Sequence, residues 1–176
     1  MKIVTLCTGN VARSVMLGYM LTTLSEVNGL DWKIRTAGTH VIEGSAMSSR
    51  TKDALISLRD VGEHQYGAHR SHQLNDDDVA WADVIVTSEA NHVNFVRANH
   101  PGGSEKTVLL AQFLREAPLD VSPSEQIRRV ALLAPSGLFD VDDPAGGDQA
   151  TYDECAAKLW AMAQAFATVV ADEESY

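Results

Sequence analysis

Cysteine and long apolar runs are scarce in this sequence. Its two cysteines, Cys7 and Cys155, are too few for the disulfide framework that small secreted domains use. No stretch approaches the roughly 18 consecutive apolar residues of a membrane span, and the first residues do not form a secretory leader. We therefore expect a cytoplasmic protein in a reducing environment, with no membrane as a partner.

Basic residues are also scarce. The chain holds 14 Lys and Arg against 24 Asp and Glu, a formal net charge of −10 at pH 7. Nucleic-acid-binding proteins present a basic face to the phosphate backbone, so this balance argues against nucleic acid as a partner. A local site for a small anion is still compatible with it, because backbone N–H groups supply positive potential without basic side chains.

The length and the apolar content fit a single domain over residues 1–176. Hydrophobic residues make up 45% of the chain, and short β-branched runs alternate with helical periodicity. The expected strands are 3–6, 32–36, 83–87 and 107–110, and the expected helices are 13–27, 48–60, one beginning at 75, 89–99, 124–133 and 151–171. This order predicts an α/β fold, a parallel sheet with helices on both faces, whose ligands bind beyond the carboxyl ends of the strands.

The most informative segment lies where the first strand turns into the first helix. It reads Cys7-Thr8-Gly9-Asn10-Val11-Ala12-Arg13-Ser14. Gly9 and Asn10 tolerate left-handed backbone angles, so the N–H groups of the loop can curl toward one point and form an anion site beside the helix dipole. Arg13 can hold two oxygens of a tetrahedral anion, and Cys7 at the rim is expected to be a thiolate at neutral pH. Ser14 can hydrogen-bond the sulfur.

A plain structural interpretation of this octapeptide stays open at this point. Cys7 would then be a buried strand residue, Gly9 and Asn10 an ordinary turn, and Arg13 a solvated residue at the start of a helix. A nucleotide-binding P-loop does not fit, because no Gly-Lys-Ser or Gly-Lys-Thr follows.

The octapeptide resembles the signature of the low-molecular-weight protein tyrosine phosphatases. Further matches follow in that family's order along most of the chain: Thr36-Ala37-Gly38-Thr39, His69 with Gln73, and Asp143-Pro144 with Gly147. The resemblance implies a four-stranded parallel sheet flanked by helices, with no cofactor and no metal. On spacing alone, His69 and His72 indicate surface residues rather than a metal pair.

The resemblance also implies a mechanism. Cys7 attacks the phosphorus of a phosphomonoester, while Arg13 and the loop N–H groups stabilise the phosphoryl oxygens. Asp143 protonates the leaving oxygen and then activates the water that releases inorganic phosphate. Asp140 and Asp142 compete for this role on proximity, but only Asp143 precedes a proline.

Other residues receive supporting roles from the same resemblance. The expected substrate is a phosphorylated protein or a small phosphomonoester, bound by the loop. Thr36 and His69 match positions that hold the loop in shape by hydrogen bonds. The expected phosphate-binding residues are Thr8, Gly9, Asn10, Val11, Ala12, Arg13 and Ser14.

Several positions depart from the family pattern. Ala145 stands where an aromatic residue normally follows the Asp-Pro pair, and Ile42 replaces another aromatic residue of the pocket wall. The phosphate chemistry is therefore intact while the aromatic slot is incomplete. The segment 115–139 is longer than in typical members and could supply a substitute wall, with Leu138 and Phe139 as the candidates.

Two loop positions bear on specificity and on redox behaviour. In the arginine-phosphatase branch of the family a threonine at position 11 helps to select phosphoarginine, whereas tyrosine-specific members carry an apolar residue there. Val11 has no hydroxyl, which argues against phosphoarginine. Ala12 replaces a second cysteine that protects the nucleophile, so Cys7 is expected to be more exposed to irreversible oxidation.

Three functions remain on this evidence. The first is a phosphomonoesterase acting on phosphotyrosine or a related aryl phosphate. The second is an arsenate reductase that uses the same loop with an external small thiol, since residues 80–100 hold no relay cysteine. The third is a weakly active phosphate-binding regulatory module, which the intact Cys7, Arg13 and Asp143 argue against. The sequence does not indicate an oligomeric state.

Overall fold

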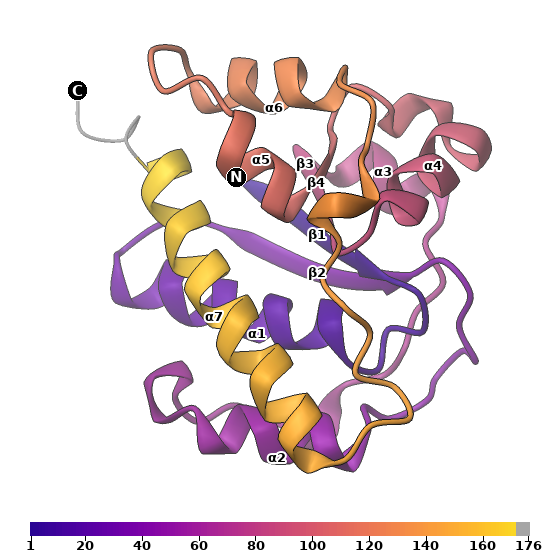
Figure 1. Cartoon of the computed structure of the whole chain (residues 1–176), viewed down its shortest axis with the longest axis vertical. Helices are drawn as coiled ribbons and strands as arrows, with labels where there is room; N and C mark the ends of the chain where they lie inside the picture. The colour runs from indigo at the N-terminus through magenta and orange to yellow at the C-terminus, as the bar shows by residue number, and fades with distance from the viewer. Residues whose placement is uncertain (172–176) are drawn as a thin grey trace.

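The computed structural model describes residues 1–171 as one parallel four-stranded sheet with helices on both faces (Figure 1). The strands are β1 (Lys2–Cys7), β2 (Lys33–Gly38), β3 (Val84–Thr87) and β4 (Thr107–Leu109), in the spatial order β2-β1-β3-β4. The α-helices are α1 (Arg13–Val27), α2 (Ser49–Ser57), α3 (Asp76–Trp81), α4 (Ala90–Asn99), α5 (Leu110–Glu116), α6 (Pro123–Ala131) and α7 (Gln149–Ala171). Short 3₁₀ turns are η1 (Arg59–Val61), η2 (Tyr66–Ala68), η3 (Pro101–Gly103) and η4 (Gly137–Phe139).

The two central strands are buried on both faces, which explains their almost continuous apolar sequence. Successive side chains of a strand point to opposite faces. Ile3 and Val86 accordingly join the core beneath α1 and α7, whereas Val4 and Ile85 join a second core beneath α3 and α4. Figure 1 shows these two helical layers on either side of the sheet.

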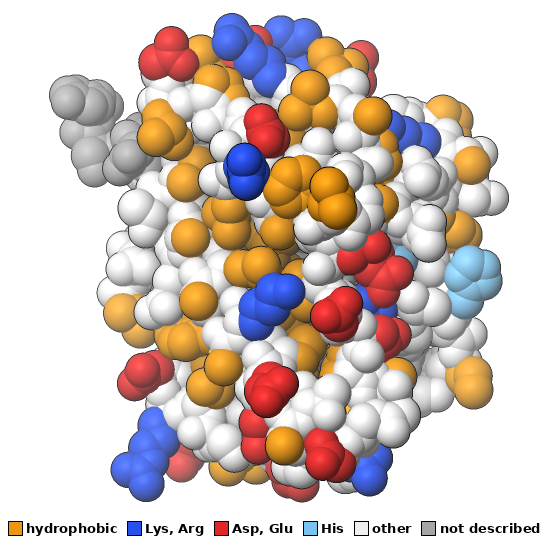
Figure 2. Space-filling view, in the orientation of Figure 1, with side chains coloured by type: hydrophobic (Ala, Val, Ile, Leu, Met, Phe, Trp, Pro, Cys, Tyr) orange, Lys and Arg blue, Asp and Glu red, His pale blue; other side chains and the backbone are white. Residues whose placement is uncertain are grey.

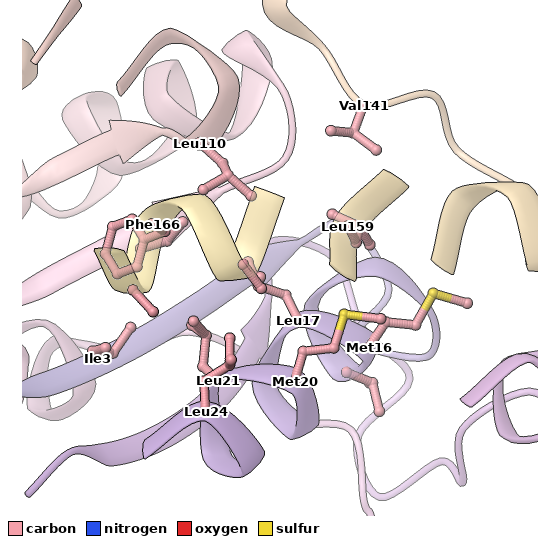
Figure 3. Packing of buried hydrophobic residues seen from close by; sticks show 14 of the residues in the cluster. Ile3, Met16, Leu17, Met20, Leu21, Leu24, Leu110, Val141, Leu159 and Phe166 are labelled. Atoms are coloured by element: carbon pink, nitrogen blue, oxygen red, sulfur yellow. The ribbon is translucent and has the colours of Figure 1, made fainter. Parts of the chain in front are cut away.

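The larger core forms between α1 and α7. In Figure 3, Met16, Leu17 and Met20 of α1 meet Leu159 and Phe166 of α7. Each of these side chains is at most 1% exposed, and burying one of this size contributes about 1.5–3 kcal/mol. This packing fixes the start of α1 against the sheet, and so fixes the loop between β1 and α1.

Most of the expected elements are present, with shifted ends. The range 48–60 divides into α2 and the 3₁₀ turn η1, and β2 continues to Gly38. Leu110, expected to be the last residue of the strand 107–110, instead begins the short helix α5. Among residues 1–171, no helix combines the length and the apolar content needed to cross a membrane.

The topology brings distant segments to one edge of the sheet. β1 ends at Cys7, β2 at Gly38 and β3 at Thr87, and all three strands run in the same direction. The segment before α7 joins them, because the N–H of Val141 donates to the carbonyl of Ser88 at 2.8 Å. Residues that are up to 130 positions apart in the sequence therefore touch at this edge.

Candidate active site

The loop between β1 and α1 depends on one residue in the left-handed region. Asn10 has a φ of 53°, the only positive φ among non-glycine residues of the described chain, and is fully buried. Its Nδ2 donates to Ser14 Oγ and to Thr36 Oγ1, both at 2.9 Å, and its Oδ1 accepts from the N–H of His72 at 2.9 Å. The carbonyl of Asn10 lies 2.8 Å from His69 Nε2. These bonds offset the cost of the strained backbone and fix the shape of the loop.

These contacts place Thr36 and His69 beside the loop, where the resemblance puts them. Burial lowers the pKa of His69, although the hydrogen bond to Asn10 opposes this shift. The ring is then neutral at pH 7 and donates Nε2–H to the Asn10 carbonyl. On the other flank, the carbonyl of Val11 accepts from Thr51 Oγ1 at 2.9 Å and from the Ser48 N–H at 3.1 Å.

The segment at the end of β2 also hydrogen-bonds to this loop. The N–H groups of Thr39 and His40 donate to the carbonyls of Cys7 and Thr8, both at 2.9 Å. Gly38 lies so close that an added Cβ would stand 2.5 Å from the carbonyl oxygen of Thr8. Only glycine fits at this position of the Thr-Ala-Gly-Thr segment.

Cys7 is the last residue of β1 and is 2% exposed. Its Sγ lies 3.0 Å from Ser14 Oγ, whose position Asn10 fixes. The serine hydroxyl is therefore placed to hydrogen-bond the sulfur, as the sequence predicts.

Arg13 is a buried residue rather than a solvated one, since its side chain is 1% exposed. Nη1 donates to Glu89 Oε1 and, at 2.8 Å, to the carbonyl of Val141, and Nη2 donates to Asp143 Oδ2 at 2.7 Å. Burial alone would lower the pKa of Arg13, but the bond to Glu89 and the charges of Asp143, Glu89 and Cys7 raise it above its ordinary value. The plain structural interpretation of the loop does not account for this arrangement.

The Arg13 guanidinium keeps two of its five N–H donors for a ligand. Three of its five N–H groups bind Glu89, Val141 and Asp143. Within residues 1–171, the Nε–H and the second Nη2–H of Arg13 have no protein partner. Neighbouring donors of this kind match two oxygens of a phosphate.

The structure distinguishes the three acidic residues before α7. Asp140 Oδ1 accepts from the N–H of Ala90 at 2.7 Å, so Asp140 anchors the start of α4. Asp142 is exposed, and its carboxylate has no hydrogen-bond partner in the described chain. Only Asp143 reaches Arg13, and its Oδ1 also accepts from the N–H of Ala145 at 3.0 Å. Acidic side chains gather around this loop in the space-filling view (Figure 2).

Two further residues contact the loop, and none of the sequence motifs includes them. Glu89 binds Arg13, and His92 Nε2 lies 3.0 Å from Thr8 Oγ1. Both belong to a capping box at the start of α4. A sequence signal existed, since Glu89 and His92 stand three residues apart at a helix start directly after a buried strand, but the familiar capping box ends in Glu or Gln rather than His.

The residues that flank the expected pocket are small or exposed. Ala145 is exposed, and Ile42 and Leu138 are 83% and 93% exposed. Phe139 instead packs against Ala90 and its neighbours on α4. Of the two residues considered as a substitute wall, only Leu138 is therefore free of the core.

Cys155 lies in the core, as expected. It is 8% exposed, its Sγ lies 4.0 Å from the carbonyl of Asp142, and burial raises the pKa of its thiol to about 11. Within residues 1–171, no cluster of three His, Cys, Asp or Glu side chains could hold a metal ion.

Comparison with known proteins agrees with this geometry. The profile of the low molecular weight phosphotyrosine protein phosphatases matches residues 2–175. A protein-arginine-phosphatase from Geobacillus stearothermophilus is 29% identical over 121 residues, which are 69% of this chain and 76% of that protein.

Solved structures are similar over almost the full length. A low molecular weight protein tyrosine phosphatase from T. tengcongensis superposes with a TM-score of 0.77 at 23% identity, covering 96% of this chain and 98% of that one. The arginine phosphatase from Geobacillus stearothermophilus gives a TM-score of 0.76 at 26% identity, with 99% and 97% coverage. The chain belongs to the low molecular weight phosphotyrosine protein phosphatase family.

Proposed function

We propose that this phosphatase hydrolyses phosphomonoesters through a phosphocysteine at Cys7, and that its substrate is phosphotyrosine or a related aryl phosphate. The observation that carries the proposal is the convergence on Arg13. Its two remaining N–H groups suit the oxygens of a phosphoryl group, and Asp143 is bound to the same guanidinium at 2.7 Å. The proposed nucleophile, anion site and acid thus lie at one edge of the sheet.

The proposed reaction has two steps. The Cys7 thiolate forms a bond to phosphorus as the ester P–O bond breaks, and Asp143 gives its proton to the leaving oxygen. Asp143 then takes a proton from water, the water oxygen attacks phosphorus, and the P–S bond breaks. Inorganic phosphate leaves, and Cys7 is again a thiolate. Arg13 and the loop N–H groups stabilise the oxygens in both transition states.

Phosphoarginine is the second candidate substrate. It is favoured by the similarity to the protein-arginine-phosphatase. Against it stands Val11, which offers no hydroxyl to the substrate. We therefore place phosphotyrosine first, and we propose the reducing cytoplasm as the compartment because Cys7 must stay a free thiol.

The test is a comparison of substrates on the purified protein. Phosphotyrosine, phosphoarginine and arsenate with a small thiol are assayed side by side, with Cys7→Ser as the inactive variant and Cys155→Ser as the matched control. The proposal expects turnover of phosphotyrosine above that of phosphoarginine, abolished by Cys7→Ser and nearly unchanged in Cys155→Ser. A preference for phosphoarginine, or for arsenate, would overturn the substrate assignment while leaving the site in place.

A further inference from the structure

The start of α4 holds both ends of the phosphate loop. The side chain of Glu89 caps the N–H of His92 and also accepts from Arg13. In return, His92 Nδ1 accepts from the N–H of Glu89 at 3.2 Å, and His92 Nε2 lies 3.0 Å from Thr8 Oγ1. One capping box therefore contacts the residue that follows the cysteine and the arginine that closes the loop.

The proton on His92 can be placed from its partners. His92 is 3% exposed, and burial together with the nearby charge of Arg13 lowers the pKa of His92 to about 4. The ring is therefore neutral at pH 7 and carries a single N–H. Because Nδ1 accepts from Glu89, the hydrogen lies on Nε2 and is donated to Thr8 Oγ1.

This bond leaves the Thr8 hydroxyl with a hydrogen to donate. A hydroxyl has one hydrogen and two acceptor positions, and His92 occupies one of the acceptor positions. Within residues 1–171, His92 is the only partner of Thr8 Oγ1. Thr8 is half-buried, whereas Cys7 and Asn10 on either side of the loop are buried.

We propose that His92 is a positioning residue, which fixes the Thr8 hydroxyl as a hydrogen-bond donor to an oxygen of the phosphoryl group. The inference rests on the proposed phosphatase function and extends it to two residues outside the cysteine–arginine–aspartate set. A donor that is oriented before the substrate arrives stabilises the charge of the transition state without reorganising during the reaction.

Two conservative substitutions separate this role from helix capping. The amide of Asn overlays the Nδ1 of a histidine, so His92→Asn keeps an acceptor for Glu89 N–H but does not reach Thr8. The amide of Gln overlays Nε2, so His92→Gln keeps an N–H for Thr8 but loses the cap. The proposal expects His92→Asn to lower kcat/KM for p-nitrophenyl phosphate about five- to tenfold, mainly in kcat, with little change in Tm. His92→Gln should show a lower Tm but a smaller loss of kcat than His92→Asn.

Variants of Thr8 supply a test that does not depend on the fold of α4. Thr8→Ser keeps the hydroxyl and should lose less kcat/KM than Thr8→Val, which should lose as much as His92→Asn. Combining Thr8→Val with His92→Asn should cause no further loss, because both changes remove the same donor. The inference is overturned if the two losses multiply, if Thr8→Val is fully active, or if His92→Gln loses as much rate as His92→Asn. Failure of the wild-type protein to hydrolyse any phosphomonoester would instead contradict the proposed function itself.

Discussion

Nη2 of Arg13 donates to Oδ2 of Asp143 at 2.7 Å, which joins a guanidinium that is 1% exposed to a carboxylate whose side chain is 43% exposed. The arginine is fixed by the core, while the aspartate lies on an exposed loop. Asp143 can therefore turn from Arg13 toward a leaving oxygen without disturbing the packed interior. The contact also places the proposed acid beside the two N–H groups that would hold the phosphoryl group.

The role of Asp143 predicts a dependence on the leaving group. Asp143→Ala should slow the hydrolysis of phosphate esters with poor leaving groups by about 10²–10⁴, the usual range for general acid catalysis. The loss should shrink for activated aryl phosphates, whose oxygen departs without a proton. Steady-state rates on a series of aryl phosphates of graded leaving-group pKa measure this slope.

The neighbouring acids serve as controls. Asp142→Ala should leave both rate and stability near wild type, because its carboxylate is exposed and has no partner in the described chain. Asp140→Ala should lower the free energy of unfolding by about 0.5–2 kcal/mol through the loss of its bond to the Ala90 N–H. If the rate loss in either variant depended on the leaving group, the assignment of the general acid to Asp143 would be wrong.

Because the Asn10 side chain holds the loop in shape, we expect its removal to weaken both the stability of the fold and the binding of phosphate. Asn10→Ala removes three side-chain hydrogen bonds and leaves a residue with a Cβ at a φ of 53°, so it should cost about 2–4 kcal/mol of unfolding free energy and most of the activity. Asn10→Gly relieves the backbone strain and should recover part of the stability but not the activity. Urea unfolding and calorimetric titration with inorganic phosphate measure the two effects, and equal phosphate affinity in wild type and Asn10→Gly would refute this expectation.

Because Gly38 packs closely against the loop, we expect a single added methyl group there to displace the loop. An added Cβ would stand 2.4 Å from Val41 Cγ1 and 2.5 Å from the Thr8 carbonyl, so Gly38→Ala should displace the loop and sharply reduce turnover. Gly102→Ala is the matched control, since nothing lies within 4 Å of its Cβ position. Rates and Tm of both variants test this, and an active Gly38→Ala protein would show that the loop tolerates movement.

The small pocket wall predicts weak binding of isolated phosphotyrosine. Ala145 offers no aromatic ring, and one aromatic pair adds roughly 0.5–1.5 kcal/mol beyond area burial. KM should therefore lie near or above the upper end of the usual range of about 1 μM–1 mM. Ala145→Tyr should lower KM several-fold with little change in kcat, while Ala161→Tyr on the exposed face of α7 should change neither. An unchanged KM in Ala145→Tyr would mean that this loop does not border the substrate.

The parallel strands and their alternation with helices followed from local patterns, but the strand order and the contacts of the site did not. Val84 to Val86 and Ile3 to Leu6 are short apolar runs between helical segments, and such runs indicate buried parallel strands. By contrast, the sequence near Leu110 does not separate a strand end from a helix, because a seven-residue helix is determined by packing rather than by propensity.

The sequence predicts only those site residues that belong to a motif. Cys7, Arg13 and Asp143 carry motif signals, and the structure brings Arg13 and Asp143 into contact. Glu89 and His92 lie in no motif of the loop, and their roles arise because β3 ends beside β1. Contacts of this kind depend on strand order, which local sequence does not encode.

Burial of His92 predicts a pH dependence of stability. Its pKa is about 4 in the folded protein against an ordinary value of 6.5, so folding favours the neutral ring. The resulting stability is complete above about pH 6.5 and is lost as the pH falls toward 4. The difference in unfolding free energy between wild type and His92→Gln should therefore narrow as the pH falls from 7.5 to about 5. Burial lowers the pKa of His72, but its bonds to Asp78 and Glu43 raise it by more, so the net shift is upward. The difference in unfolding free energy between wild type and His72→Gln should therefore widen as the pH falls. If the difference in unfolding free energy between wild type and His92→Gln did not change with pH, His92 would not be held neutral in the folded protein.

The most direct test of the central claim is to trap the phosphoenzyme. Asp143→Ala should slow hydrolysis of the phosphoenzyme, whereas an activated aryl phosphate needs no proton on its leaving oxygen and should still phosphorylate Cys7. The intermediate should therefore accumulate, and a rapid acid quench should preserve it. Peptide mass spectrometry should then find one phosphoryl group on Cys7 and none on Cys155, and the signal on Cys7 should vanish in the Cys7→Ala variant together with turnover. Turnover that persists in Cys7→Ala, or a phosphoryl group carried by another residue of an active protein, would contradict the mechanism.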